Sequence, residues 1–177
     1  MKFVAACLVT MIVWTAATAE VMQSSRIATL EAGVLCSPPT IGSAPAPGTI
    51  AGKTHIIADD PEFVAASRRV PALLGIGFGV KSQAFDPEGI ADVTVRLSHP
   101  EMGDADVTMQ SFATSIGGTG TSLTFYQFDH SYELVKGTWE FAAYAGEEQL
   151  YAVTFEVVDP KSVPELAGVC GFLDLLA

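Results

Sequence analysis

The sequence has few charged residues, fewer basic than acidic ones, and no asparagine. Charged residues make up 16% of its 177 positions, and 9 lysines and arginines stand against 20 aspartates and glutamates, a formal net charge of −11. This deficit argues against nucleic acid or an anionic membrane surface as a partner, because both are polyanions. A hydrophobic fraction of 49% rules out intrinsic disorder. Without asparagine, N-glycosylation and Asn-Gly hairpins are impossible.

Motifs that carry well-known chemistry are also missing. There is no C-x-x-C pair and no histidine close to Cys36 or Cys170, so a zinc site at the cysteines is not expected. A serine hydrolase often carries its nucleophile on a G-x-S-x-G turn, and none is present. We expect no cofactor.

The first residues have the pattern of a secretory signal. Met1-Lys2 is a short basic start, residues 3–14 are apolar apart from Thr10, and Ala17 and Ala19 form a small-residue cleavage site before Glu20. The apolar run is shorter than the roughly 20 residues that span a hydrocarbon core. We therefore expect a signal peptide over 1–19, export to the periplasm or medium, and no transmembrane segment in the mature chain. An uncleaved N-terminal anchor is the alternative.

Removal of the signal leaves two cysteines, Cys36 and Cys170. Two cysteines in an oxidising compartment predict one disulfide, which would stabilise the fold by roughly 5 kcal/mol in the loop-entropy treatment. Two buried free thiols are the alternative. Loss of Lys2 leaves 8 basic and 20 acidic residues in the mature chain.

The middle of the chain shows the alternation of apolar and polar residues that is typical of half-buried strands. Turn signals rich in glycine, proline and aspartate separate these stretches, and no convincing helix of ten residues lies between them. The pattern predicts an all-β fold, an antiparallel β-sandwich or barrel, with Trp139 in its core. The predicted strands cover 26–35, 55–59, 63–70, 78–85, 91–98, 106–114, 122–130, 138–144 and 150–158.

Two segments stand apart from the strands. Residues 37–52 contain four prolines and three glycines, and we expect a loop that keeps no strand ladder. After Pro160, Ser162 to Glu165 reads as a capping box before one helical turn that ends near Gly168. The predicted organisation is thus a signal over 1–19, a β-sandwich over 20–159, and a tail over 160–177 pinned by Cys170.

From about Val70 onward the chain resembles a bacterial family of exported, uncharacterised immunoglobulin-like β-sandwich domains, one of the "domain of unknown function" families. The residues that carry the resemblance are Val70-Pro71 leading to Phe78-Gly79, the segment 95–100, the segment 132–141 with its G-x-W-x-F pattern, and Phe155 to Val157. It covers about two thirds of the mature chain by domain length. The resemblance implies an immunoglobulin-like fold and no catalytic residues, and it leaves the proline-rich segment and the Cys170 tail unexplained.

Four residues on one predicted turn form a candidate metal site, namely His99, Glu101, Asp104 and Asp106. Carboxylate oxygens at this spacing suit Ca²⁺, and the histidine would suit a transition metal. The cluster lacks the order of an EF-hand loop, and a solvated acidic hairpin is the alternative.

Aromatic residues form a second candidate site. If Tyr126, Phe128, Tyr144 and Tyr151 face outward together, they make a binding strip. The alternative, which we favour, is a second buried face against the proline-rich segment, because monomers rarely expose large apolar patches.

A sound β pattern without catalytic motifs favours a non-enzymatic binding or accessory module of the bacterial envelope, which meets an unidentified protein or other envelope component through loops or a sheet edge. A metal-dependent or hydrolytic enzyme that uses His99 and its acidic neighbours is one alternative. A structural envelope protein that assembles through an unpaired edge strand is another.

Overall fold

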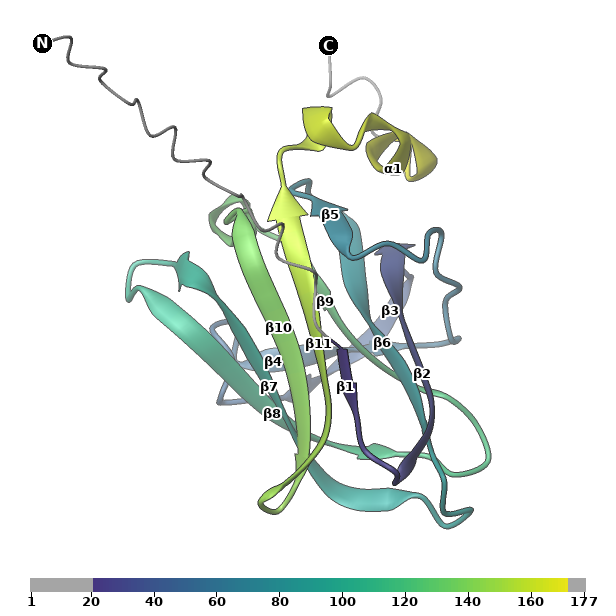
Figure 1. Ribbon diagram of the computed structural model, residues 1–177. Coiled ribbons are helices and arrows are strands. Elements are labelled where there is room, and N and C mark those ends of the chain that lie inside the picture. The colour runs from purple at the N-terminus through teal and green to yellow at the C-terminus, as the bar shows by residue number, and fades with distance from the viewer. Residues whose placement is uncertain (1–20, 172–177) are drawn as a thin grey trace, which may run out of the picture.

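The computed structural model describes residues 21–171, which fold into eleven strands and three short helical turns (Figure 1). The expected signal peptide over 1–19 lies outside the described residues. The elements are β1 (Val21–Gln23), β2 (Ile27–Cys36), β3 (Thr40–Pro45), β4 (Lys53–Ile57), β5 (Arg69–Pro71), β6 (Ile76–Ala84), β7 (Ile90–Met102), β8 (Val107–Ile116), β9 (Ser122–Gln127), η1 (Ser131–Glu133), β10 (Gly137–Ala145), β11 (Glu148–Val158), η2 (Pro160–Ser162) and α1 (Pro164–Val169).

The strands form two facing sheets and a separate hairpin, which confirms the predicted all-β fold. The larger sheet has the order β1-β11-β10-β7-β8, and β5 joins it beside β11. The smaller sheet has the order β2-β6-β9, and β3 pairs with β4 alone. All pairings are antiparallel except that of β5 with β11. In Figure 1 the β3–β4 hairpin is drawn faint, behind the other strands in this view.

Phe78 of β6 joins the two sheets at the centre of the core. It is fully buried, and its ring lies 5.5 Å from the ring of Trp139, 5.7 Å from Phe141 and 5.2 Å from Phe155. These three residues point inward from β10 and β11, as their alternation predicts. Edge-on aromatic contacts of this kind add to the hydrophobic gain of burial, so Phe78 holds the layers together.

Residues 37–52 correct the prediction of a loop without a ladder. Residues 40–45 form β3, which pairs with β4 from Thr40↔Ile57 to Pro45↔Lys53. The prolines do not prevent this because Pro38 and Pro39 precede the strand, and Pro45 ends it. In a two-stranded hairpin each strand has a free edge, so a missing proline N–H costs little.

The predicted strand over 63–70 shrinks to β5, Arg69–Pro71. The preceding residues instead cover the outer face of the smaller sheet. A side chain on Gly33 would lie 2.6 Å from the ring of Phe63, so this close packing requires glycine. The Lys81 ammonium lies 5.6 Å from the centre of the same ring and 3.0 Å from Asp60 Oδ2.

The C-terminal tail is bound to β2 as predicted. Cys36 and Cys170 form a disulfide with their Cα atoms 5.5 Å apart, and one helical turn, α1, precedes Cys170. The capping box is wrong, however. The Ser162 hydroxyl donates to the Asp159 carbonyl, while the Asp159 side chain accepts from Lys161 N and so caps η2. A polar side chain therefore caps η2, and no side chain caps the N-terminus of α1.

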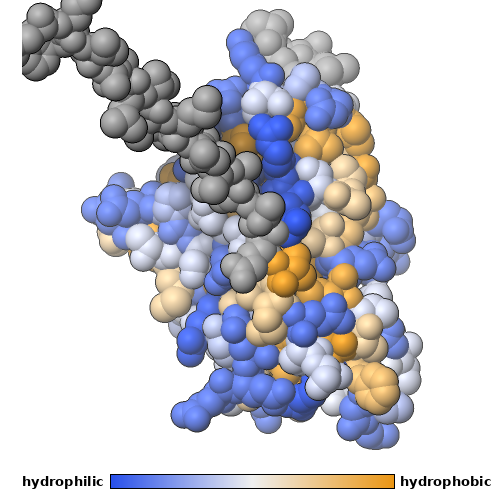
Figure 2. Space-filling view, in the orientation of Figure 1, coloured by the Kyte–Doolittle hydropathy of each residue, from blue (hydrophilic) through white to orange (hydrophobic). Residues whose placement is uncertain are grey.

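The surface mixes both kinds of side chain. On the face in Figure 2, hydrophilic side chains dominate the lower and left parts, and hydrophobic ones form a broken band on the right. Within residues 21–171, no helix has the length and hydropathy needed to cross a membrane.

Candidate functional site

A cleft opens where the two sheets part. Strand β8 ends the larger sheet and β9 ends the smaller one, so each has a strand partner on one side only in the part of the chain described. The β3–β4 hairpin lies across the gap between them. The cleft has a volume of about 210 Å³ and is lined by Thr49, Ala51, Lys53, Thr54, His55, Leu97, Gln110, Phe112, Ala113, Thr114, Leu123, Thr124, Phe125, Tyr126, Gln127, Asp129 and Glu133.

The connection between β3 and β4 is fastened to β8 by two hydrogen bonds. Ser111 N donates to the Gly48 carbonyl at 2.9 Å, and Ile50 N donates to Gln110 Oε1 at 2.9 Å. Glycine is required at position 48, because a Cβ there would lie 2.4 Å from the Ser111 carbonyl oxygen. One wall of the cleft is thereby fixed on the edge strand.

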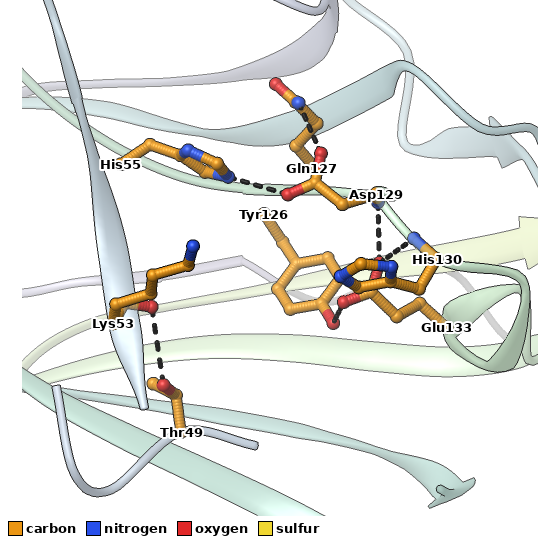
Figure 3. A network of polar contacts seen from close by, with 8 residues as sticks. All are labelled: Thr49, Lys53, His55, Tyr126, Gln127, Asp129, His130 and Glu133. Carbon is orange, nitrogen blue, oxygen red and sulfur yellow. Dashed lines mark hydrogen bonds and ion pairs between the residues drawn. The ribbon is translucent and has the colours of Figure 1, made fainter. Parts of the chain in front are cut away.

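At its other end the hairpin is fastened to the residues after β9. His55 Nε2 donates to Asp129 Oδ2 at 2.6 Å, and Gln127 Nε2 donates to Asp129 Oδ1 at 2.6 Å (Figure 3). The side chains of His55 and Asp129 are 32% and 33% exposed. Both carboxylate oxygens of Asp129 are therefore occupied by neighbours, at a site that water still reaches.

Glu133 of η1 is a buried carboxylate, only 5% exposed, beside the same segment. Its Oε1 accepts from the Tyr126 hydroxyl at 2.9 Å, and its Oε2 accepts from the backbone N–H groups of Asp129 and His130 at 2.6 and 2.7 Å. Burial, followed by the nearby Glu133 charge, raises the pKa of Tyr126. Tyr126 consequently remains a neutral donor, and Glu133 holds the turn after β9 in place (Figure 3).

His99, the predicted metal ligand, is instead part of the packed interior. It is 6% exposed, and its ring lies 4.8 Å from that of Trp139. Its Nδ1 donates to the Pro100 carbonyl at 2.8 Å, so Nε2 is the acceptor for Gln110 Nε2 at 3.1 Å. Burial lowers the pKa of His99, only partly offset by the Pro100 hydrogen bond.

The other three predicted ligands are exposed: Glu101 lies near the end of β7, and Asp104 and Asp106 lie in the β7–β8 turn. No group of three histidine, cysteine, aspartate or glutamate side chains within 21–171 is placed to hold a metal ion. The structure therefore does not bring the four residues together. His99 faces the interior, whereas a register shift between Ser98 and Met102 interrupts the alternation of β7 and leaves Glu101 exposed, and Asp104 and Asp106 lie in the exposed turn.

The four aromatic residues of the second prediction lie in different places. Phe128 and Tyr151 are fully buried, and Tyr126 lines the cleft. Tyr144 lies on the outer face of the larger sheet, with the Arg96 guanidinium 4.6 Å from its ring centre. The structure thus contradicts an exposed strip. Phe128 does not face outward because it packs on Phe78 and Trp139 in the core.

The sequence reasoning missed His55, Gln110, Asp129 and Glu133. No local signal could reveal the contact of His55 with Asp129, which are 74 positions apart. Glu133 offered one local signal, because it lies three residues after His130. A carboxylate at that position from a helix start often accepts a hydrogen bond from the backbone.

Comparison with known proteins places the chain in a family. The model of the family described as Domain of unknown function (DUF3859) matches residues 24–157. The chain belongs to this family. The match starts well before Val70 and includes β2 and the proline-rich segment, so the DUF3859 region is larger than the resemblance suggested. The Cys170 tail lies outside the matched residues.

One solved structure that matches is an immunoglobulin-like protein from Pseudomonas aeruginosa. The two sequences are 22% identical, the match covers 81% of this chain and 100% of the other, and the TM-score is 0.48. No curated protein matches the sequence. The DUF3859 assignment is therefore the family-level finding, and it carries no activity with it.

Proposed function

We propose that this DUF3859 protein is an exported, non-enzymatic binding module of the bacterial envelope whose ligand occupies the cleft between β8 and β9. The signal pattern over 1–19 supports export, and so does the Cys36–Cys170 disulfide, since such bonds persist in oxidising compartments. Concave sites with a few fixed polar groups are the usual places where proteins bind small ligands.

The observation that carries the proposal is the fixed cleft itself. Its polar groups are held by hydrogen bonds to the surrounding backbone and side chains, as at Gln110, Asp129 and Glu133. A site that is already ordered loses little conformational freedom when a ligand enters, which favours affinity.

The cleft does contain titratable groups bonded to one another, a feature that an enzyme would also show. A nucleophilic mechanism needs a hydroxyl or thiol held by the base. Among the described residues no serine, threonine or cysteine side chain hydrogen-bonds the rings of His55 or His99. Glu133 has its oxygens engaged by three donors. These contacts support binding rather than nucleophilic catalysis.

A photo-crosslinking amino acid placed at Ala113, which lines the cleft, tests the proposal in cells that express the protein. The matched control is the same residue at exposed Ala91, at the far end of β7 and not in the cleft lining. We expect an adduct from position 113, identified by mass spectrometry, that Asp129→Asn diminishes. Equal labelling from both positions, or none at 113, would contradict the proposal.

A further inference from the structure

An apolar hollow lies outside the β8–β9 cleft, where three segments that are distant in the sequence meet. Ile50 comes from the connection between β3 and β4, and Tyr132 comes from η1. Met102 at the end of β7 and Val107 at the start of β8 complete its apolar walls. The hollow has a volume of about 360 Å³, and none of its lining residues also lines the cleft. It is therefore a separate feature of the surface.

Two large side chains of the hollow are exposed to water. Ile50 is 38% exposed and Tyr132 is 40% exposed, whereas Met102 is buried and forms the floor. Tyrosine is among the residues that most often supply binding energy in protein–protein interfaces, and such residues act beside pockets that a partner fills. The hollow between these side chains is thus a place where an anchoring side chain of a partner can be buried.

The walls of the hollow are fixed by hydrogen bonds and by the shape of the β7–β8 turn. Ile50 N donates to Gln110 Oε1 at 2.9 Å. In the turn, Asp106 N donates to the Gly103 carbonyl at 3.3 Å. A Cβ on Gly103 would lie 4.0 Å from Ile50 Cδ1, so the turn and the β3–β4 connection lie against each other. A surface that is already ordered loses little conformational freedom when a partner binds.

The charge around the hollow is of one sign. Residues 97–135, which include all of its lining except Ile50, contain five acidic residues and no lysine or arginine. Glu101, Asp104 and Asp106 are exposed, and within residues 21–171 none of the three forms an ion pair. Asp104 also lines the hollow. Because the protein does not neutralise these carboxylates itself, lysine or arginine on a partner would be attracted to them.

We propose that the hollow is the docking site of a partner polypeptide that inserts one large apolar side chain flanked by lysine or arginine. The apolar walls favour the inserted side chain, and the unpaired carboxylates favour its basic neighbours. A second copy of this chain, with its net charge of −11, would be repelled, and so would an anionic lipid surface. This site goes beyond the proposed function and does not depend on a ligand in the cleft.

Binding is measured by amide chemical-shift titration of the ¹⁵N-labelled, oxidised protein at low ionic strength. The probe is the end-blocked peptide Lys-Lys-Phe-Lys-Lys. Lys-Lys-Ser-Lys-Lys lacks the anchor, and Glu-Glu-Phe-Glu-Glu reverses the charge. We expect the probe to bind about fivefold more tightly than either control peptide, with shift changes at Ile50, at residues 103–107 and at Tyr132. Added salt should weaken its binding, because it screens exposed charges.

Ile50→Ser tests the apolar anchor, since it removes one wall and keeps the backbone N–H that bonds Gln110. We expect it to weaken binding of the probe about fivefold. Phe85→Ser is the matched control and leaves affinity unchanged, because Phe85 is 75% exposed and does not line the hollow. Thermal unfolding establishes that both variants fold, and Tyr132→Ser replaces Ile50→Ser if that variant does not.

Asp104→Asn combined with Asp106→Asn tests the charge. Asp106 has a φ of +49°, which asparagine tolerates, so the turn keeps its shape. We expect the double variant to weaken binding about three- to tenfold. Glu88→Gln combined with Asp92→Asn is the matched control, because it removes two carboxylates at the other end of β7, one of them also at a positive φ. It should leave affinity unchanged.

The absence of shift changes at millimolar probe overturns the inference. Equal binding of the probe and the serine peptide would show that no side chain is anchored, and equal binding of the acidic peptide would show that charge plays no part. Shift changes confined to residues 123–127 would place the peptide in the cleft instead. Losses no larger in the hollow variants than in their controls would mean a general attraction to the acidic surface. Each of these results contradicts docking at the hollow.

Discussion

The imidazole of His55 and the carboxylate of Asp129 meet at 2.6 Å across 74 positions of sequence. The contact joins β4 to the segment just past β9 and thereby holds the β3–β4 hairpin over the cleft. Both side chains are about one-third exposed, and pairs that water reaches contribute little to global stability. We therefore expect the His55–Asp129 pair to affect the position of the hairpin more than the stability of the fold.

Replacement His55→Gln should therefore loosen the hairpin without unfolding the sandwich. We expect the unfolding free energy to fall by less than about 1 kcal/mol, while the amides of β3 and β4 exchange faster with deuterium. Lys136→Gln removes a more exposed ion pair with Asp159 and is the control. Unchanged exchange in the hairpin of the His55 variant would contradict its role as a fastener.

His99 should make the fold sensitive to acid. Its pKa is lowered by burial from the ordinary 6.5, so the unfolded chain binds the proton more readily than the folded one. The neutral form is favoured in the fold, and stability is lost as pH falls below about 6.5. Protonation would also place a second N–H against the amide of Gln110, which now donates to the ring.

Urea unfolding of the wild type and His99→Gln between about pH 7 and pH 5 measures this effect. We expect the wild type to lose stability more steeply than the variant, because the titratable groups other than His99 are present in both proteins. Parallel curves over this range would show that His99 does not couple protonation to folding.

Glu133 should matter more than an exposed carboxylate. In Glu133→Gln only one oxygen remains to accept, and an amide N–H₂ group faces donors. We expect a loss of about 1–3 kcal/mol in unfolding free energy, the cost of unsatisfied buried groups. A double-mutant cycle with Tyr126→Phe isolates the 2.9 Å hydrogen bond. Additive losses would mean that the two side chains do not act together.

Reduction of Cys36–Cys170 should destabilise the protein strongly. The bond closes a loop of 134 residues, for which the loop-entropy treatment gives about 4–5 kcal/mol. Because the family match ends at residue 157, we expect the reduced protein to keep its sheets while the tail loosens. Denaturant unfolding with and without reductant, and Cys36→Ser/Cys170→Ser, measures the change. A change below about 1 kcal/mol would contradict this prediction.

The fold was largely readable from the sequence because strand alternation is a local property. Trp139, Phe141 and Phe155 point inward as their spacing predicts, and the compartment argument paired the two cysteines correctly. β3 was not predicted, because the prolines of residues 37–52 indicated a loop. A two-stranded hairpin with free edges tolerates proline. Residues 63–68 alternate like a strand, but they pair with β2 through one isolated bridge, Val34↔Ala65, while Phe63 covers Gly33 and Lys81.

The cleft was not predictable, because it is made by contacts between segments far apart in the chain. Ile50 meets Gln110 across 60 positions, and neither residue type signals the other. Clustering in the sequence suggested a metal site at His99 and its acidic neighbours, and that prediction was wrong. His99 is buried, whereas Glu101, Asp104 and Asp106 are exposed. The register shift near the end of β7 and the turn that follows it separate these side chains, and neither is visible in the spacing of the residues.

Amide chemical-shift mapping tests the central claim most directly. The ¹⁵N-labelled protein is titrated with the small-molecule fraction of an envelope extract from cells that express it. The account predicts that shifts concentrate at Thr114, at residues 123–127 of β9 and at the hairpin residues 49, 51 and 53–55, all of which border the cleft. Shifts confined to the outer faces of the sheets, with the cleft residues unmoved, would contradict it.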